Sequence, residues 1–250
     1  MRRSTVTSAC LITLGLAATP ARAAFHFMKV VEFFPGTSAS PDAQYVVLQM
    51  YFAGQNFVAT HRVTVFDATG TNVGTFTFAG DVANGANQAK ILIATPAAQT
   101  LFGITADLAM TLVIPLRGGK ICFDAIPEDC VAWGTWSGGP SGVGTPVAAP
   151  AGLRRNQAVV RRLDVAGSPT ILESADDTDV CASDFRLGVP APVNNAGHTG
   201  VVPDSICGND VIEGLEECDD GNLVNDDTCD NTCSLTFVFG DDFEAGPPPE

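Results

Sequence analysis

The residues with the most evident chemistry lie between positions 207 and 233. This stretch of 27 residues holds four cysteines and nine acidic side chains, and it contains no Lys or Arg. Successive cysteines are separated by ten, ten and three residues, with no histidine among them, which matches no common zinc pattern. In an oxidising compartment such cysteines form disulfides. We therefore expect two bridges, with all three pairings open, among Cys207, Cys218, Cys229 and Cys233.

Oxygen-bearing side chains in the same stretch are candidate calcium ligands. Calcium takes about six to eight oxygen ligands, and the five candidates, four Asp and one Asn, lie within nine residues around Gly221. The pattern is not an EF-hand, because it lacks the Gly at the sixth position and the Glu at the twelfth. Asp and Asn side chains also build turns by accepting hydrogen bonds from nearby backbone N–H groups. Both interpretations stay open for Asp219, Asp220, Asn222, Asp226 and Asp227.

No other group of residues predicts catalysis. Ser137 lies in "GTWSGG", but a nucleophile elbow needs Gly where the chain has Thr135, and it needs a turn from a strand into a helix. Glu32 is a single acid on an expected strand, where a solvated or edge position is usual. The histidines are not spaced for metal binding; they are His26, His61 and His198. We predict no catalytic residues, no resident cofactor apart from the calcium hypothesis, and no enzymatic activity.

Two tryptophans in "VAWGTWSG" are the candidates for surface recognition. An aromatic ring flanked by glycines can present a flat platform to a sugar or a peptide. We expect Trp133 to fill the core and Trp136 to be the binding candidate.

The remaining cysteines constrain the body of the protein. Cys122 in "GKICF" and Cys130 in "DCVAWG" lie on two expected strands joined by a loop with Pro127, so we expect them to pair across one hairpin. Cys181 is then the odd cysteine. It is either buried as a small hydrophobic residue or available for pairing between molecules.

These residues must be positioned by a mainly β structure. From Phe27 to about Arg162, short β-branched and aromatic runs alternate with Gly, Asn, Asp and Pro, as in an all-β sandwich; an open barrel is the alternative. "DATGTN" (67–72) predicts a tight hairpin turn, and "TPAAQTLFG" (95–103) predicts the one helix, with Thr95 as its N-cap. The expected strands lie in "FMKVVEFF", "QYVVLQMYF", "HRVTVFDA", "NVGTFTF", "KILIA", "MTLVIPL", "GKICF", "DCVAWG" and "QAVVRRL".

The N-terminus has the form of a secretory signal. Residues 1–23 combine Arg2 and Arg3, a ten-residue apolar core and a small-residue cleavage pattern before Ala24. Removal of this segment leaves ten basic against 28 acidic groups, a net charge of about −18. Such a charge opposes binding to phosphate backbones, so we expect no nucleic-acid partner. No later stretch is long and apolar enough to predict a membrane span.

Residues 27–197 resemble the lamin-tail-like domain of bacterial secreted proteins. The resemblance is carried by "MKVVEFFPG", "AQYVVLQMYFAG", "CVAWGTWSG", "AVVRR" and "DVCASDFRLGVPAPVNN", although the usual Glu-Tyr-Val-Glu-Leu strand reads Gln-Tyr-Val-Val-Leu at 44–48. It implies an immunoglobulin-like β-sandwich, which we place at residues 24–190, followed by a linker at 191–205.

Residues 206–234 resemble the Myxococcus-type cysteine-rich repeat. Its Cys-Gly-Asn and Glu-Cys-Asp-Asp-Gly-Asn elements are present at 207–209 and 217–222, while the usual Asp-Gly-Cys reads Asp-Thr-Cys at 227–229. The remaining 235–250 form an acidic, Pro-rich tail similar to an ending of exported proteobacterial proteins. Together the resemblances imply an exported protein of a Gram-negative bacterium, and none of them carries a known catalytic set.

Two functions are compatible with these features. The first is an exported, non-catalytic interaction or structural protein that binds a protein or glycan in the periplasm, at the cell surface or outside the cell. The alternative is an accessory or degenerate component of a secreted hydrolase, because lamin-tail-like domains accompany exported nucleases and phosphatases.

Overall fold

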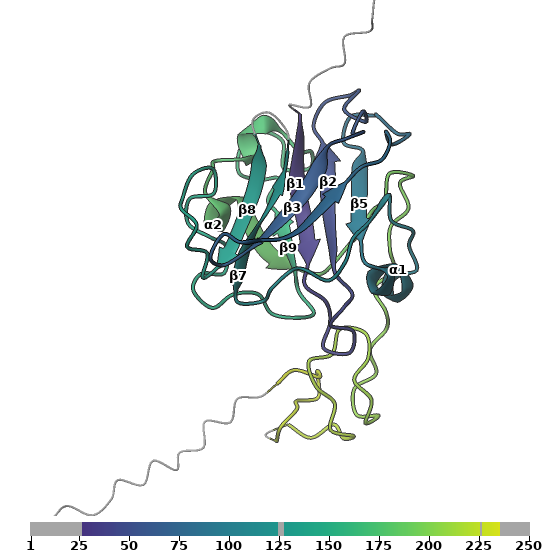
Figure 1. The fold of residues 1–250 in the computed structure, drawn as a ribbon. Coiled ribbons are helices and arrows are strands. Elements are labelled where there is room, and N and C mark those ends of the chain that lie inside the picture. Colours follow the sequence, from purple (N-terminus) through teal and green to yellow (C-terminus); the bar gives the residue numbers. More distant parts are fainter. Residues whose placement is uncertain (1–26, 125–127, 226, 236–250) are drawn as a thin grey trace, which may run out of the picture.

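The protein is a β-sandwich with a small disulfide-bonded module below it (Figure 1). The computed structural model describes residues 27–124, 128–225 and 227–235. The expected signal segment, His26, Asp226 and the tail from residue 236 lie outside these ranges. Within the described ranges, ten strands form two separate sheets, so the sequence prediction of an all-β sandwich is confirmed and the open barrel is wrong.

The larger sheet is antiparallel except at one edge, where β6 runs parallel to β5. Its central strand β2 is buried along its whole length, which explains why "YVVLQM" is almost continuously apolar rather than alternating. In spatial order the sheet contains β10 (Phe185–Gly188), β9 (Ala158–Arg161), β1 (Met28–Phe34), β2 (Tyr45–Met50), β5 (Lys90–Ala94) and β6 (Leu108–Ala109).

The smaller sheet is entirely antiparallel. In spatial order it contains β4 (Asn72–Thr77), β3 (Arg62–Asp67), β7 (Gly118–Phe123) and β8 (Asp129–Gly134). The register of β7 on β8 places Cys122 directly opposite Cys130, and the two form a disulfide as the hairpin predicts.

Apolar side chains fill both faces of the larger sheet. Between the sheets, Phe33 packs on Trp133 with ring centroids 4.9 Å apart. On the outer face a second cluster joins Phe34, Tyr45 and Phe102, the last of which belongs to helix α1 (Pro96–Phe102). The helix therefore covers the larger sheet, and β1 and β2 are buried on both faces.

The two local motifs predicted from the sequence are present. The Thr95 side chain accepts a hydrogen bond from the backbone of Ala98 at the start of α1, and Gly103 ends the helix with a left-handed φ of 58°. In the hairpin turn, Asp67 accepts the backbone N–H groups of Thr69 and Thr71 at 2.9 and 3.0 Å.

Three parts of the body differ from the expectation. "MTLVIPL" (110–116) forms no strand, because Gln44 already bonds to the backbone of Val113 and Ile114 through its own side chain. "FRLG" forms the unexpected edge strand β10, preceded by the short helix α2 (Cys181–Asp184) and the 3-10 turn η1 (Ser174–Asp176). Residues 191–205 were expected to be a linker, yet the Asn195 side chain bonds to Asn84 and Lys90 of the sandwich.

The C-terminal module is held by two nested disulfides. Cys207 pairs with Cys233, and Cys218 pairs with Cys229 inside that loop. The module is joined to the sandwich by Asn156, whose side-chain amide donates to the backbone carbonyl of Glu216 at 3.0 Å. In the part of the chain that the structure describes, no helix has the length and apolar character that a bilayer crossing needs.

Candidate functional site

A buried ionic cluster joins the two sheets at the end where β1 begins. Arg161 of β9 lies 3.3 Å from the carboxylate of Asp129 on β8, and Lys29 of β1 lies at the same distance from that carboxylate. Asp177 pairs with Lys29 and Arg161 as well. Burial disfavours the charge of Asp177, but Arg161 and Lys29 outweigh this effect and lower its pKa to about 2. The cluster is satisfied internally and links the sheets.

Glu32 is not the solvated or edge residue that the sequence suggested. Its side chain is buried, and its Oε1 accepts hydrogen bonds from the hydroxyl of Tyr45 and, at 2.7 Å, from the backbone of Ala191. Burial raises the pKa of Glu32, although these two hydrogen bonds act in the opposite direction. The carboxylate fastens the segment after β10 to the central strands.

The structure does not bring the hydroxyl and imidazole candidates together. Ser137 donates its hydroxyl to the backbone carbonyl of Ala68, just after the end of β3. His61 precedes the start of β3, and its Nδ1 lies 3.2 Å from Asp124. The whole length of β3, roughly 20 Å at 3.3 Å per residue, separates the two positions. His198 lies in the segment 191–205, where its backbone N–H donates to Asn194.

The two tryptophans occupy different environments. Trp133 is fully buried and donates its indole N–H to the carbonyl of Pro115 at 2.8 Å, so the expected core role is confirmed. Trp136 is half-buried. Its indole N–H donates to the backbone carbonyl of Gly139, and the ammonium of Lys120 lies 5.1 Å from its ring centre. One face of the Trp136 ring is therefore already occupied by a neighbour.

The carboxylate of Asp219 organises the C-terminal module. It accepts four backbone N–H groups, at 2.8 to 3.2 Å, from Gly208, Asn209, Asp210 and Gly221. Desolvation alone would raise the pKa of Asp219, but the four hydrogen bonds outweigh it and hold this pKa below its usual value.

The other candidate calcium ligands are also used in turns. Asp220 accepts the backbone N–H of Asn222, and the side-chain amide of Asn222 donates to Asp227 at 3.3 Å. These hydrogen bonds agree with the interpretation that the acids build turns. Calcium binding stays a prediction, and one of its expected ligands, Asp226, lies outside the described residues.

An exposed group of aromatic rings was missed in the sequence. Phe27, just before β1, packs against Tyr51 and Phe52, just after β2, with ring centroids 5.4 and 5.5 Å apart. The side chains of Phe27 and Phe52 are 41% and 62% exposed. In the sequence these three residues read as the continuation of strand runs, and only the pairing of β1 with β2 brings their ends together. We call Phe27, Tyr51 and Phe52 the aromatic tip.

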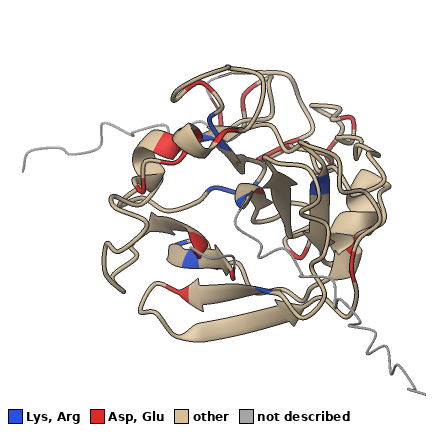
Figure 2. Cartoon of the chain, turned by 90° about the horizontal axis from the view of Figure 1, so that it is seen from above, with Lys and Arg blue, Asp and Glu red and all other residues tan. Residues whose placement is uncertain are grey.

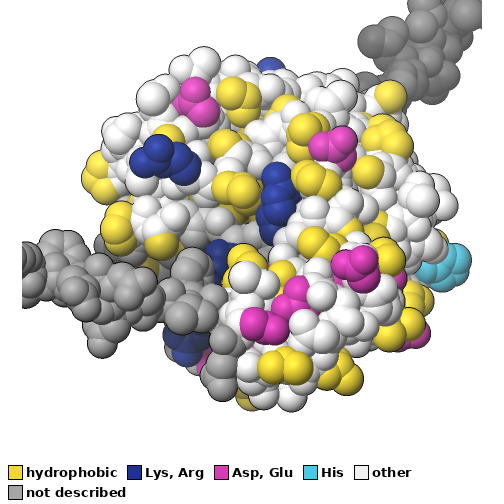
Figure 3. All heavy atoms as spheres, turned by 90° about the horizontal axis from the view of Figure 1, so that it is seen from below, with side chains coloured by type: hydrophobic (Ala, Val, Ile, Leu, Met, Phe, Trp, Pro, Cys, Tyr) yellow, Lys and Arg dark blue, Asp and Glu magenta, His cyan; other side chains and the backbone are white. Residues whose placement is uncertain are grey.

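The second candidate surface is a cleft at the end of the sandwich opposite the aromatic tip, between the sandwich and the C-terminal module. We call it the basal cleft. It has a volume of about 320 Å³ and an apolar wall formed by Leu116, Leu153 and Leu235. Arg154 and Arg155 line it from the sandwich, and Glu217 lines it from the module. Figure 3 shows basic and hydrophobic side chains around a hollow on this lower face.

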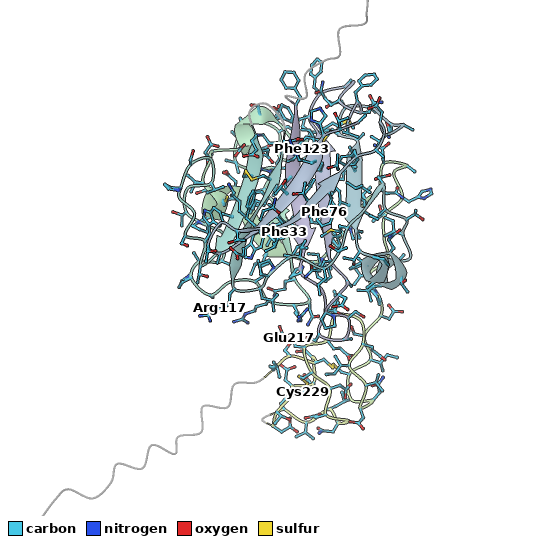
Figure 4. The ribbon with its side chains drawn as sticks, viewed as in Figure 1. Phe33, Phe76, Arg117, Phe123, Glu217 and Cys229 are labelled. Carbon is cyan, nitrogen blue, oxygen red and sulfur yellow. A yellow bond between two sulfur atoms is a disulfide. The ribbon has the colours of Figure 1, made fainter. Side chains whose placement is uncertain are left out.

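The charge distribution makes this cleft unusual for the protein. Seen from above, acidic residues lie mainly in the loops around the sheets and basic residues are few (Figure 2). Four of the basic residues are neutralised in ion pairs: Lys29, Arg62, Arg161 and Arg162. Of the described basic residues that form no such pair, Arg154 and Arg155 line the cleft, and Figure 4 places Arg117 at the base of the sandwich on the side of Glu217. The others are Lys90, Lys120 and Arg186.

A comparison of the chain with protein-family models, with curated proteins and with solved structures finds no match. The two sequence resemblances therefore stay predictions. The assignment of fold rests on the two sheets described above, and the assignment of function rests on the exposed surfaces of this chain.

Proposed function

We propose that the protein is an exported, non-catalytic binding protein whose ligand is a protein or glycan, contacted through the aromatic tip. The observation that carries the proposal is the exposure of Phe27 and Phe52, packed against each other on strand ends that the sandwich fixes. Exposed aromatic clusters mark interaction surfaces, because their burial against a partner is favourable and their rigid rings lose little entropy.

The surroundings of the tip suit recognition rather than reaction. The loop that pairs with the end of β2 carries the exposed amide side chain of Asn87. The neighbouring Gln88 positions this loop, because its backbone N–H donates to Met50 at 3.0 Å and its side chain bonds to Gln49 and Leu172. Amide groups next to aromatic rings supply the directional hydrogen bonds that glycan and peptide ligands require. Export is supported by the three disulfides, which form and persist in oxidising compartments.

The proposal is tested with glycan and protein arrays probed with the mature, oxidised chain. The variant Phe52→Ala removes the most exposed ring of the tip, and Leu112→Ala removes a similarly exposed apolar side chain elsewhere, at 54% exposure. We expect a ligand whose binding falls at least tenfold with Phe52→Ala and is unchanged with Leu112→Ala. A ligand bound equally by both variants would place the contact surface elsewhere, and an array without any ligand would contradict the proposed function.

A further inference from the structure

The basal cleft combines an apolar wall with cations that lack a counter-charge. The guanidinium of Arg155 is anchored, since its Nη1 donates to the carbonyls of Pro35 and Pro41 at 3.3 and 3.1 Å. Its other nitrogens make no hydrogen bond among the described residues, and Arg154 is exposed and makes none there. Glu217, the acid that lines the cleft, accepts the backbone N–H of Leu235.

This arrangement selects the chemistry of an occupant. Guanidinium groups bind carboxylates in planar, bidentate geometry, and an apolar wall favours aromatic or aliphatic side chains. In a chain with 28 acidic and 13 basic residues, Arg154 and Arg155 line the cleft without an ionic partner among the described residues and form a local site for anions, and Arg117 directly follows the lining residue Leu116. The fitting occupant is an acidic segment that also carries large apolar side chains. The volume of the cleft, about 320 Å³, falls at the lower end of the range of ligand pockets.

The chain itself contains such a segment next to the cleft. Leu235 is part of the apolar wall, so residue 236 begins at the cleft. Residues 236–250 include no Lys or Arg, and they read "TFVFGDDFEAGPPPE". Asp241 is six residues beyond Leu235 and can lie up to about 20 Å from it, at roughly 3.4 Å per residue. The carboxylates can therefore reach both arginines, and the phenylalanines can reach the leucines.

We infer that the acidic tail 236–250 docks in the basal cleft of its own chain, with Asp241, Asp242 and Glu244 facing Arg117, Arg154 and Arg155. The tail then neutralises the cleft and covers its apolar wall. The inference concerns the end of the molecule opposite the aromatic tip and does not depend on the proposed function.

The test uses the complete mature chain and a fluorescent synthetic peptide with the sequence of residues 236–250. One variant neutralises the attached tail through Asp241→Asn, Asp242→Asn and Glu244→Gln, which alters no described residue. We expect the peptide to bind this variant, and to bind the wild-type chain at least tenfold more weakly, because the attached tail is present at a high effective concentration. The affinity for the variant should fall with added salt.

A pair of arginine substitutions in the tail-neutralised chain locates the site. Arg154→Gln removes a cleft cation that makes no described hydrogen bond, and we expect peptide affinity to fall at least fivefold. Arg62→Gln, at the opposite end of the smaller sheet, should leave it unchanged. No peptide binding to the tail-neutralised chain would overturn the inference. Equal binding to both chains would also overturn it, because the cleft would then be open to segments from other molecules.

Discussion

The hydroxyl of Tyr45 on β2 donates a hydrogen bond to the carboxylate of Glu32 on the adjacent strand β1. The same carboxylate oxygen accepts the backbone N–H of Ala191, which follows β10 by three residues. One buried acid therefore connects two central strands to a segment distant in sequence. Both Glu32 and Tyr45 lie in stretches whose sequence predicts a lamin-tail-like domain, and their contact gives these positions a structural role.

The first prediction concerns the pH dependence of stability at Glu32. Burial raises its pKa in the folded protein above the usual 4.5, so the native state binds the proton more tightly than the unfolded chain. The stabilising contribution of Glu32 is present below pH 4.5 and is lost as the pH rises through the raised folded pKa. We expect the unfolding free energy of wild type, relative to Glu32→Gln, to decrease in urea titrations as the pH rises above 4.5. Parallel pH profiles for the two proteins would refute the shift.

A second prediction compares two adjacent arginines. The Arg161 side chain is fully buried, bonds to the backbone carbonyl of Val30 at 2.9 Å and pairs with Asp129, whereas Arg162 is 39% exposed and pairs with Asp164 at the surface. Removing one partner of a buried ion pair leaves an uncompensated charge and costs about 3 to 5 kcal/mol, whereas a surface pair is screened by water and contributes little. Chemical denaturation of Arg161→Ala and Arg162→Ala should reproduce this difference. Similar losses for both variants would contradict it.

The sequence predicted the parts of the fold that depend on local patterns. Strand runs, the turn at Asp67, the helix capped by Thr95 and the Cys122–Cys130 pair all follow from period, turn chemistry and hairpin register. It failed where a distant side chain decides the outcome. Residues 110–116 have a strand-like pattern, but Gln44 occupies their backbone groups with its side chain instead of a neighbouring strand.

The candidate surfaces were beyond sequence reasoning for a related reason. Phe27 and Phe52 are 25 residues apart and become neighbours only through the register of β1 on β2. Likewise, Leu116, Arg154 and Leu235 come from three segments that meet at the base of the sandwich. The glycines around Trp136 suggested an exposed binding platform. The sequence could not show that the Lys120 ammonium lies over its ring, because Lys120 belongs to a different strand.

A third prediction concerns the unpaired cysteine. Cys181 is buried, its Sγ accepts the backbone N–H of Ala132 at 3.3 Å, and burial raises the pKa of its thiol to about 11. The thiolate is the reactive form, so alkylation of the native protein at pH 8 should be very slow. Mass spectrometry should find modification of Cys181 only after unfolding in guanidinium chloride without reductant. Rapid labelling of the native chain, or a dimer that reductant dissociates, would contradict burial.

The last prediction separates turn formation from calcium binding in the C-terminal module. Because the carboxylate of Asp219 accepts four backbone N–H groups, Asp219→Ala should expose the amides of Gly208, Asn209 and Asp210 to rapid hydrogen exchange. Asp220→Asn is the matched control, since the Asp220 carboxylate accepts a single backbone N–H. If the acids only build turns, the control should retain protection, and calcium and magnesium at equal ionic strength should have equal effects.

A calcium site through Asp219, Asp220, Asn222, Asp226 and Asp227 would give a different result in the same experiment. Calcium would then increase the protection of these amides more than magnesium does, because it binds the folded module and not the unfolded chain. Asp220→Asn would reduce this excess by removing a charged ligand, while leaving the four hydrogen bonds to Asp219 in place. Because the Asp219 carboxylate is already occupied by four backbone N–H groups, we expect calcium and magnesium to change amide protection equally. Selective protection by calcium that Asp220→Asn weakens would instead establish the metal site, with Asp219 serving both the backbone and the ion.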